Sequence, residues 1–349
     1  MKKSAALNKQ ADKLTSPAEI MSTFFKPAKE AATSDERIKL NSLFSCICRL
    51  FRQSLILPFS LTFNMKFLLT SLFPVKKKIF LIMYLLKSLL KKGLSKKILV
   101  PSDKRFIFLY HDVSNSDSPQ YSEHYSTKIS AFHNHIEFFS KHFKFVSLDE
   151  IISADHGEQE RLAAITFDDG FLSVKTEILP YLKERGIPFT VFLNTSAVKT
   201  NSLKYKTGNA SIERSYETKV YLDENDVWEI SEQGVLIGSH TANHKVLSEC
   251  AAAELGEEIS DAKHYLETLV KYKIKHLALP FGKREHYNDA VLKFCRNAGH
   301  EYIYSTNPVF FDRKYLNASR LIPRIGLTNE SVEELYFYIN RPLVKTINI

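Results

Sequence analysis

Cysteine is scarce in this chain, with four residues in 349, and their positions exclude a disulfide framework. Cys46 and Cys48 are only one residue apart, which is too close for a zinc-ribbon pair, while Cys250 and Cys295 stand alone. Four free thiols are therefore expected. They favour a reducing compartment, although they are also compatible with export.

Long apolar runs are lacking as well. A membrane-spanning helix needs about 20 consecutive apolar residues, but residues 53–75 contain two prolines and a lysine, and the apolar stretch 79–86 ends at Lys87. An amphipathic helix lying on a membrane surface over Lys76–Lys92 is the preferred interpretation, with a true span as the alternative. The first 40 residues also lack the apolar core of a signal peptide, although a start at Met65 would look more signal-like.

The positive charge belongs to the first third of the chain. The net charge is +9, but residues 1–104 hold 20 Lys+Arg and 6 Asp+Glu (net +14), whereas residues 105–349 hold 28 and 33 (net −5). Nucleic acid is not an expected partner, because no basic patch is interleaved with aromatic residues on a recognisable module. A basic leader rich in Leu, Ile and Phe fits an anionic membrane surface better.

Composition divides the chain into three segments. Residues 1–42 are polar without a sustained period and are expected to be a disordered leader. Residues 43–104 form a basic apolar segment, whose part 43–99 could contact a membrane surface. Residues 105–349 are expected to fold as one domain. We therefore expect a membrane-associated or cytoplasmic protein, with export as the alternative.

Short apolar runs alternate with amphipathic stretches from Arg105 onward. Such alternation predicts parallel strands joined by crossover helices. Seven or eight units in about 220 residues predict a closed or nearly closed βα barrel. The expected strands cover residues 106–110, 143–148, 162–167, 189–193, 235–238, 276–279, 302–305 and 321–325.

Residues that could bind a ligand or take part in catalysis follow these strands one after another. Functional side chains of a βα barrel lie at the C-terminal ends of its strands, so these residues are expected on one rim. They are His111, Asp168, Asp169, His240, His244, Pro280, Phe281 and Arg324.

Asp169, His240 and His244 are a candidate metal-ligand set. Zinc-type ions accept imidazole nitrogen and carboxylate oxygen, and catalytic sites keep one position for water. Asp168 would remain off the metal and act as a base toward that water, whose pKa falls to about 7 on coordination. The ordinary alternatives are two capping or loop histidines and an Asp-Gly turn, but the two strand ends taken together favour the metal site.

Three motifs resemble those of polysaccharide deacetylases of the NodB-homology type (carbohydrate esterase family 4). They are Thr166-Phe167-Asp168-Asp169-Gly170, His240-Thr241-Ala242-Asn243-His244 and Ala278-Leu279-Pro280-Phe281-Gly282. The resemblance runs from about Arg105 to Leu327 and includes Leu109-Tyr110-His111. It implies a distorted (β/α)7 barrel that removes acetyl groups from an N-acetylated polysaccharide or glycan precursor. It also implies a divalent metal, with zinc expected and cobalt or nickel as alternatives.

The resemblance assigns roles by position. Asp168 would be the catalytic base, and Asp169, His240 and His244 would hold the metal. The backbone N–H of Phe281 would help to stabilise the oxyanion.

The chain departs from the family pattern in three places, one of which is the absence of the Asp-x-x-Asp-Trp fourth motif. The third motif lacks its usual arginine, and we expect Arg324 to replace it and pair with Asp168; the alternative is an ordinary surface arginine. The late Leu-x-His motif, which supplies a general acid, has no counterpart after His300. His111 and Pro280 are expected to contact substrate, although His111 could simply bond backbone at a strand end.

The missing acid keeps a second function open. The chain could be a catalytically weak, metal-containing glycan-binding protein held at a membrane. A non-haem iron oxygenase fits less well, because such sites usually place one His close to the carboxylate in sequence and the other far away.

Overall fold

The computed structural model describes residues 98, 100–118, 120–153, 160–207, 210–215, 218–319 and 321–345. The expected leader and nearly all of the expected membrane-surface segment lie outside these residues. No helix in the described part is long and apolar enough to cross a membrane. The chain divides into two compact units, of which Pro101–Val332 contains every residue of the candidate site. The helix α15 (Val332–Lys345) lies almost entirely in the other unit.

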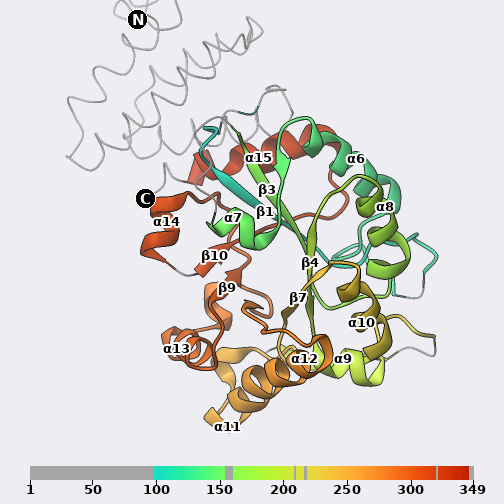
Figure 1. The fold of residues 1–349 in the computed structure, drawn as a ribbon, viewed down its shortest axis with the longest axis vertical. Coiled ribbons are helices and arrows are strands. Elements are labelled where there is room, and N and C mark those ends of the chain that lie inside the picture. The colour runs from blue at the N-terminus through green and yellow to red at the C-terminus, as the bar shows by residue number, and fades with distance from the viewer. Residues whose placement is uncertain are drawn as a thin grey trace, which may run out of the picture. The chain divides into compact units, whose positions relative to one another are not determined.

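A parallel sheet forms the centre of the Pro101–Val332 unit (Figure 1). Its order is β10-β9-β8-β7-β4-β3-β1-β11, and β2 also pairs with β3. The strands are β1 (Arg105–Tyr110), β2 (Lys144–Phe145), β3 (Leu162–Phe167), β4 (Phe189–Leu193), β7 (Leu236–Ser239), β8 (His276–Ala278), β9 (Tyr302–Ser305), β10 (Leu321–Pro323) and β11 (Ile325–Gly326). The parallel, nearly closed sheet expected from the sequence is confirmed.

One residue joins the two ends of this sheet. The strand β10 pairs with β9 at one end of the order, and β11 pairs with β1 at the other. Only Arg324 separates β10 from β11 in the chain. The expected last strand, 321–325, is therefore two short strands that close the barrel through Arg324.

The central strands are buried along their whole length because both faces of the sheet are covered. Every residue of β1 and β3 is buried, and their near-continuous apolar sequences are typical of parallel strands in such a position. Phe108 of β1 stacks on Phe139 of the covering helix α6 (Ile129–Ser140), with ring centroids 4.0 Å apart. Phe132 and Ile136 are buried on the same helix, as the period of the sequence predicts.

Helices lie around the outside of the curved sheet (Figure 1). The remaining α-helices of this unit are α7 (Leu148–Ser153), α8 (Leu179–Glu184), α9 (Thr195–Thr200), α10 (Glu224–Glu232), α11 (Ala252–Leu255), α12 (Ala262–Val270), α13 (Asp289–Asn297) and α14 (Arg313–Ala318). Two π-helical turns, η1 (Val174–Ile178) and η3 (Gly256–Asp261), and two 3₁₀ turns, η2 (Leu247–Glu249) and η4 (Arg284–His286), extend them. The sequence did not predict the antiparallel hairpin of β5 (Ser202–Thr207) and β6 (Ala210–Ser215).

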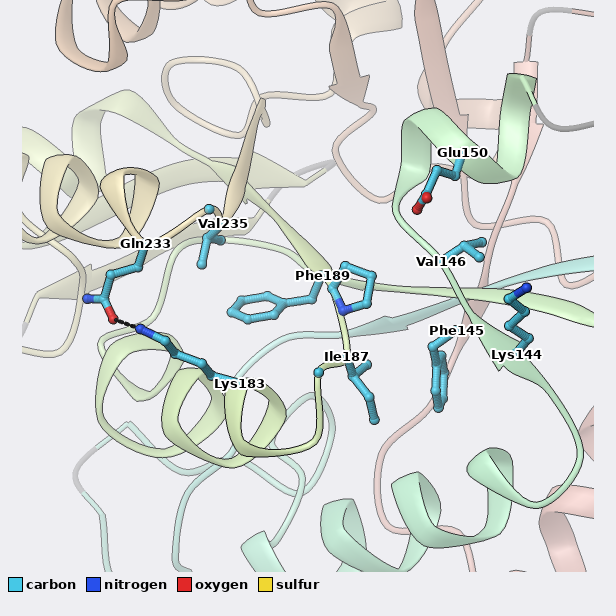
Figure 2. A pocket seen from close by; sticks show the side chains of 12 residues that line it. Lys144, Phe145, Val146, Glu150, Lys183, Ile187, Phe189, Gln233 and Val235 are labelled. Atoms are coloured by element: carbon cyan, nitrogen blue, oxygen red, sulfur yellow. Dashed lines mark hydrogen bonds between the residues drawn. The ribbon is translucent and has the colours of Figure 1, made fainter.

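The expected second strand is much shorter than its apolar pattern suggested. β2 pairs with the beginning of β3, and β4 pairs with the end of β3. Because β1 occupies the other edge of β3, β2 and β4 share one edge. A cavity of about 450 Å³ opens beside them at the N-terminal ends of the strands, lined by Phe145, Ile187, Phe189 and Val235 among others (Figure 2). It lies at the opposite end of the strands from Asp168, so it is not the candidate site.

Candidate metal and catalytic site

The C-terminal ends of β3 and β7 bring three possible metal ligands together. Asp169, His240 and His244 are buried, and one donor atom of each lies within 4.8 Å of the others. The Nε2 atoms of His240 and His244 are 3.6 Å and 3.7 Å from Asp169 Oδ1. A tetrahedral ion with bonds of about 2.0–2.1 Å separates neighbouring donors by about 3.3 Å. The spacing and the nitrogen and oxygen donor set therefore fit a zinc-type ion.

Left-handed backbone conformations concentrate in the two segments that carry these ligands. Asp169, Thr241 and His244 have φ angles of 70°, 70° and 57°. Such conformations cost about 1–3 kcal/mol each for residues other than glycine and persist only where the surrounding structure holds them. Gly170 has a φ of 74°, and a Cβ there would lie 2.6 Å from Leu193 Cδ2. Both facts explain why glycine ends the Asp-Asp-Gly turn.

His240 is oriented by backbone and side-chain partners. Its Nδ1 lies 2.8 Å from the carbonyl oxygen of Ala278. Since a carbonyl only accepts hydrogen bonds, Nδ1 is the donor, and Nε2 is the ring nitrogen that faces Asp169. Asn194, a buried residue that the sequence analysis did not single out, donates its side-chain N–H to the carbonyl oxygen of His240.

Asp168 is bound by both terminal nitrogens of Arg324. Arg324 Nη1 and Nη2 donate to Asp168 Oδ1 and Oδ2 at 2.7 Å and 2.8 Å. Arg324 is completely buried, with its guanidinium 5.1 Å from the Phe192 ring centroid and 5.9 Å from that of Tyr304. The structure therefore places Arg324 in the core and not on the surface.

The charge on Asp168 is stabilised against its burial. Burial favours the neutral carboxyl group, but the positive charge and hydrogen bonds of Arg324, with a contribution from His240, outweigh it and lower the pKa of Asp168 to about 2. Asp168 Oδ2 lies 3.7 Å from His240 Nε2. An ionised carboxylate thus faces the point on which the three ligands converge.

His111 follows β1 on the same rim. Burial is the main influence on its pKa and lowers it, while the charges of Asp169 and Asp168 oppose this shift. The next residue, Asp112, is fully buried and accepts hydrogen bonds from the hydroxyl groups of Ser173 and Ser114. These bonds fix the chain directly after His111. The sequence indicated Asp112 only by its place beside His111.

Pro280 and Phe281 form the turn after β8. Phe281 has a φ of 60°, and its ring centroid is 4.6 Å from that of His244. Thr306 holds the turn through its N–H to the Gly282 carbonyl (2.9 Å) and its hydroxyl to the Phe281 carbonyl (2.7 Å). Pro280 itself is buried and shapes the turn, and its expected contact with substrate stays a prediction.

Residues 155–303 match the family model described as polysaccharide deacetylase. Over this segment the chain is similar to polysaccharide deacetylases. It is 24% identical over 206 residues to the putative polysaccharide deacetylase YxkH of Bacillus subtilis, covering 58% of this chain and 64% of that protein. It is 28% identical over 145 residues to a peptidoglycan-N-acetylglucosamine deacetylase of Bacillus cereus, covering 41% and 56%. The polysaccharide deacetylase match thus spans less than two thirds of each relative.

The fold of this chain is also found among solved structures. The Streptococcus pyogenes deacetylase PplD, solved with acetate, superposes with a TM-score of 0.55 at 20% identity. The superposition covers 69% of this chain and 99% of PplD. At this identity the likeness shows the barrel fold alone, which the sequence had predicted.

Proposed function

We propose that the chain is a metal-dependent hydrolase that removes N-acetyl groups from an amino-sugar polysaccharide or glycan precursor. The amide that it cleaves is a carbon–nitrogen bond outside a peptide. One observation carries the proposal: the ionised Asp168 lies beside a compact Asp169, His240 and His244 cluster on one rim of the barrel. The similarity of residues 155–303 to the polysaccharide deacetylase model supports the reaction class.

Three residues would hold the cofactor. A divalent ion bound by Asp169, His240 and His244, with zinc expected and cobalt or nickel as alternatives, would acidify a water molecule and polarise the acetyl carbonyl group. His240 is held for this role by the carbonyl oxygen of Ala278, which fixes the imidazole tautomer and ring orientation.

Asp168 serves as the general base that accepts a proton from the attacking water. Arg324 keeps this carboxylate ionised and fixes both of its oxygens, so that its orientation does not depend on the substrate. This pairing takes the place of the arginine that the third motif lacks.

His111 serves as the general acid that protonates the departing amine. It ends the sequence Leu109-Tyr110-His111, which is a Leu-x-His pattern on the first strand instead of near the end of the chain. His111 directly follows β1, whose last residue, Tyr110, is paired with Phe167 just before Asp168, and this neighbouring position supports the role. Because burial lowers the pKa of His111, the imidazole would take up a proton during the reaction before it donates one to the amine. The alternative, a catalytically weak, metal-containing glycan-binding protein held at a membrane, would lack such an acid.

The turn after β8 stabilises negative charge on the acetyl oxygen. The backbone N–H of Phe281 is proposed as a donor, since this residue packs directly against His244. Contact with a membrane surface through residues 43–99 stays a prediction from composition.

Acetate release by the full-length chain tests the proposal. Oligomers of N-acetylglucosamine should yield acetate and free amine, and a chelator should stop the reaction until Zn²⁺ is restored. Absence of acetate with the zinc-loaded chain on several N-acetylated glycans would overturn the proposed function.

A further inference from the structure

One buried carboxylate holds the loop that carries both candidate histidine ligands. Glu258 lies in the π-helical turn η3, and its side chain is completely buried. Its Oε2 accepts the backbone N–H of Asn243 at 2.8 Å, and its Oε1 accepts the side-chain N–H of Asn243 at 2.8 Å. Its backbone carbonyl accepts the N–H of Ala242 at 3.1 Å. Glu258 therefore bonds the two residues directly before His244.

The loop that carries His240 and His244 needs such a restraint because its backbone conformation is energetically unfavourable. Thr241 and His244 have left-handed φ angles, which residues other than glycine adopt only when neighbours hold them there. The Thr241 hydroxyl accepts the His244 N–H at 3.1 Å. The Asn243 side chain also accepts a hydrogen bond from the Ser196 hydroxyl at the beginning of α9. Asn243 is thus fixed from two sides, and His244 follows it directly.

Burying the carboxylate of Glu258 is energetically unfavourable, which indicates a role beyond packing. A buried carboxylate needs charged or hydrogen-bonding partners. Lys245 Nζ is 3.9 Å from Glu258 Oε1, but it is closer to Glu254, at 3.0 Å. The two Asn243 N–H groups are therefore the short-range partners of the Glu258 carboxylate among the described contacts. Single π-helical turns within helices also occur frequently at functional sites.

We propose that Glu258 is a positioning residue for the metal site. It holds Asn243 so that the imidazole of His244 meets His240 and Asp169 at metal-binding distance. The inference rests on the proposed function, because it concerns the ligands of the same ion. A residue that only stabilised the fold would affect unfolding without affecting metal coordination.

Zinc titration of the metal-free, full-length chain by calorimetry tests the role. Glu258→Gln should weaken zinc binding about 10–100-fold, the usual effect of removing a partner that orients a ligand. The glutamine amide has only one oxygen, so its N–H group would face one of the two Asn243 N–H donors. One of the two hydrogen bonds to Asn243 would therefore be lost. The matched control is Glu257→Gln, in the same turn but exposed, which should bind zinc as the wild type does.

A second substitution restores the side-chain hydrogen bond between positions 243 and 258 with donor and acceptor exchanged. In Glu258→Gln/Asn243→Asp the glutamine can donate to the introduced carboxylate and still accept the backbone N–H. The double variant should regain most of the affinity, whereas Asn243→Asp alone should lose it through two facing carboxylates. The visible spectrum of the Co²⁺-loaded proteins should change in the single variants and return toward that of the wild type in the double variant.

The outcomes separate the two proposals. Wild-type zinc affinity in Glu258→Gln, or a double variant as weak as the single ones, would overturn the positioning role alone. Failure of the wild-type chain to bind zinc, cobalt or nickel would overturn the proposed function and this role with it.

Discussion

Arg324 and Asp168 form a two-point ion pair at the place where the barrel closes. Arg324 is the residue between β10 and β11, which pair with opposite ends of the sheet, and both of its terminal nitrogens bind Asp168. The same residue therefore joins the sheet and orients the proposed base. Closure of the barrel and geometry of the site are coupled through this one side chain.

Replacing Arg324 should affect both stability and pH dependence. Arg324→Met leaves Asp168 buried without its main partner, which should cost about 3–5 kcal/mol of unfolding free energy, measured by urea denaturation at neutral pH. Arg185→Met, on the surface, should have little effect.

The pH dependence has a definite sign. The folded pKa of Asp168, about 2, lies below its usual 3.8, so its stabilisation is present above the unfolded pKa and is lost as pH falls from about 4 toward 2. Without Arg324, burial should raise this pKa and move the acid limb of the activity profile upward. Full activity with an unshifted profile would contradict the pairing role.

Asp168→Asn should separate catalysis from metal binding. The amide cannot accept the proton, and loss of a general base typically costs about 10²–10⁴-fold in rate. Zinc content, measured by atomic absorption, should stay near the wild-type value because Asp168 is not among the three ligands. A wild-type rate of acetate release would refute the assignment of the base.

His240→Ala and His244→Ala should each abolish stoichiometric zinc binding. Removing one of three ligands leaves too few donors for a stable site. The control is His264→Ala, on the exposed face of α12. The zinc content of all three purified proteins provides the measurement, and retention of one equivalent of zinc by either site variant would rule out the cluster as the metal site.

His111→Gln should lower kcat about 10²–10⁴-fold, the range typical of general acids and bases, without loss of zinc. One limb of a bell-shaped pH–rate profile should disappear with it. His124→Gln, at an exposed position, should leave the profile unchanged. If His111→Gln kept both limbs, the proton would have to come from another group.

Gly238→Ala should destabilise the barrel through crowding alone. A Cβ at Gly238 would lie 2.5 Å from the Phe192 ring, and this ring packs under the guanidinium of Arg324. Overpacking of this kind costs about 1–3 kcal/mol, measurable by urea denaturation. Gly326→Ala is the matched control in another strand of the sheet, because a Cβ at Gly326 would meet nothing within 4 Å, and equal stabilities of the two variants would contradict the prediction.

Local patterns predicted several of the elements and the candidate metal ligands. The apolar runs of β1 and β3 and the period of α6 follow from short-range rules of burial and helix geometry. Asp169 and His240 follow strands that run in the same direction, so their common rim could be predicted without coordinates.

Other features depended on contacts between distant parts of the chain. The sequence suggested one last strand where the structure has two, because the break at Arg324 serves to pair with both β9 and β1. The stretch after His244 folds in three parts, α11, η3 and α12, and the middle part buries Glu258. The predicted second strand was too long because β4 takes over the edge of β3 from β2.

By itself, the sequence determined the strand–helix alternation, the parallel sheet and the identity of the candidate base and ligands, since these depend on neighbours along the chain and on strand direction. Only the tertiary structure decided that Arg324, which the sequence paired with Asp168, is buried in the core and not on the surface, and that Glu258 holds the His244 loop. Glu258 is 15 positions from Asn243, and Arg324 is 156 positions from Asp168. Such partners are set by how the barrel closes, which no local pattern encodes.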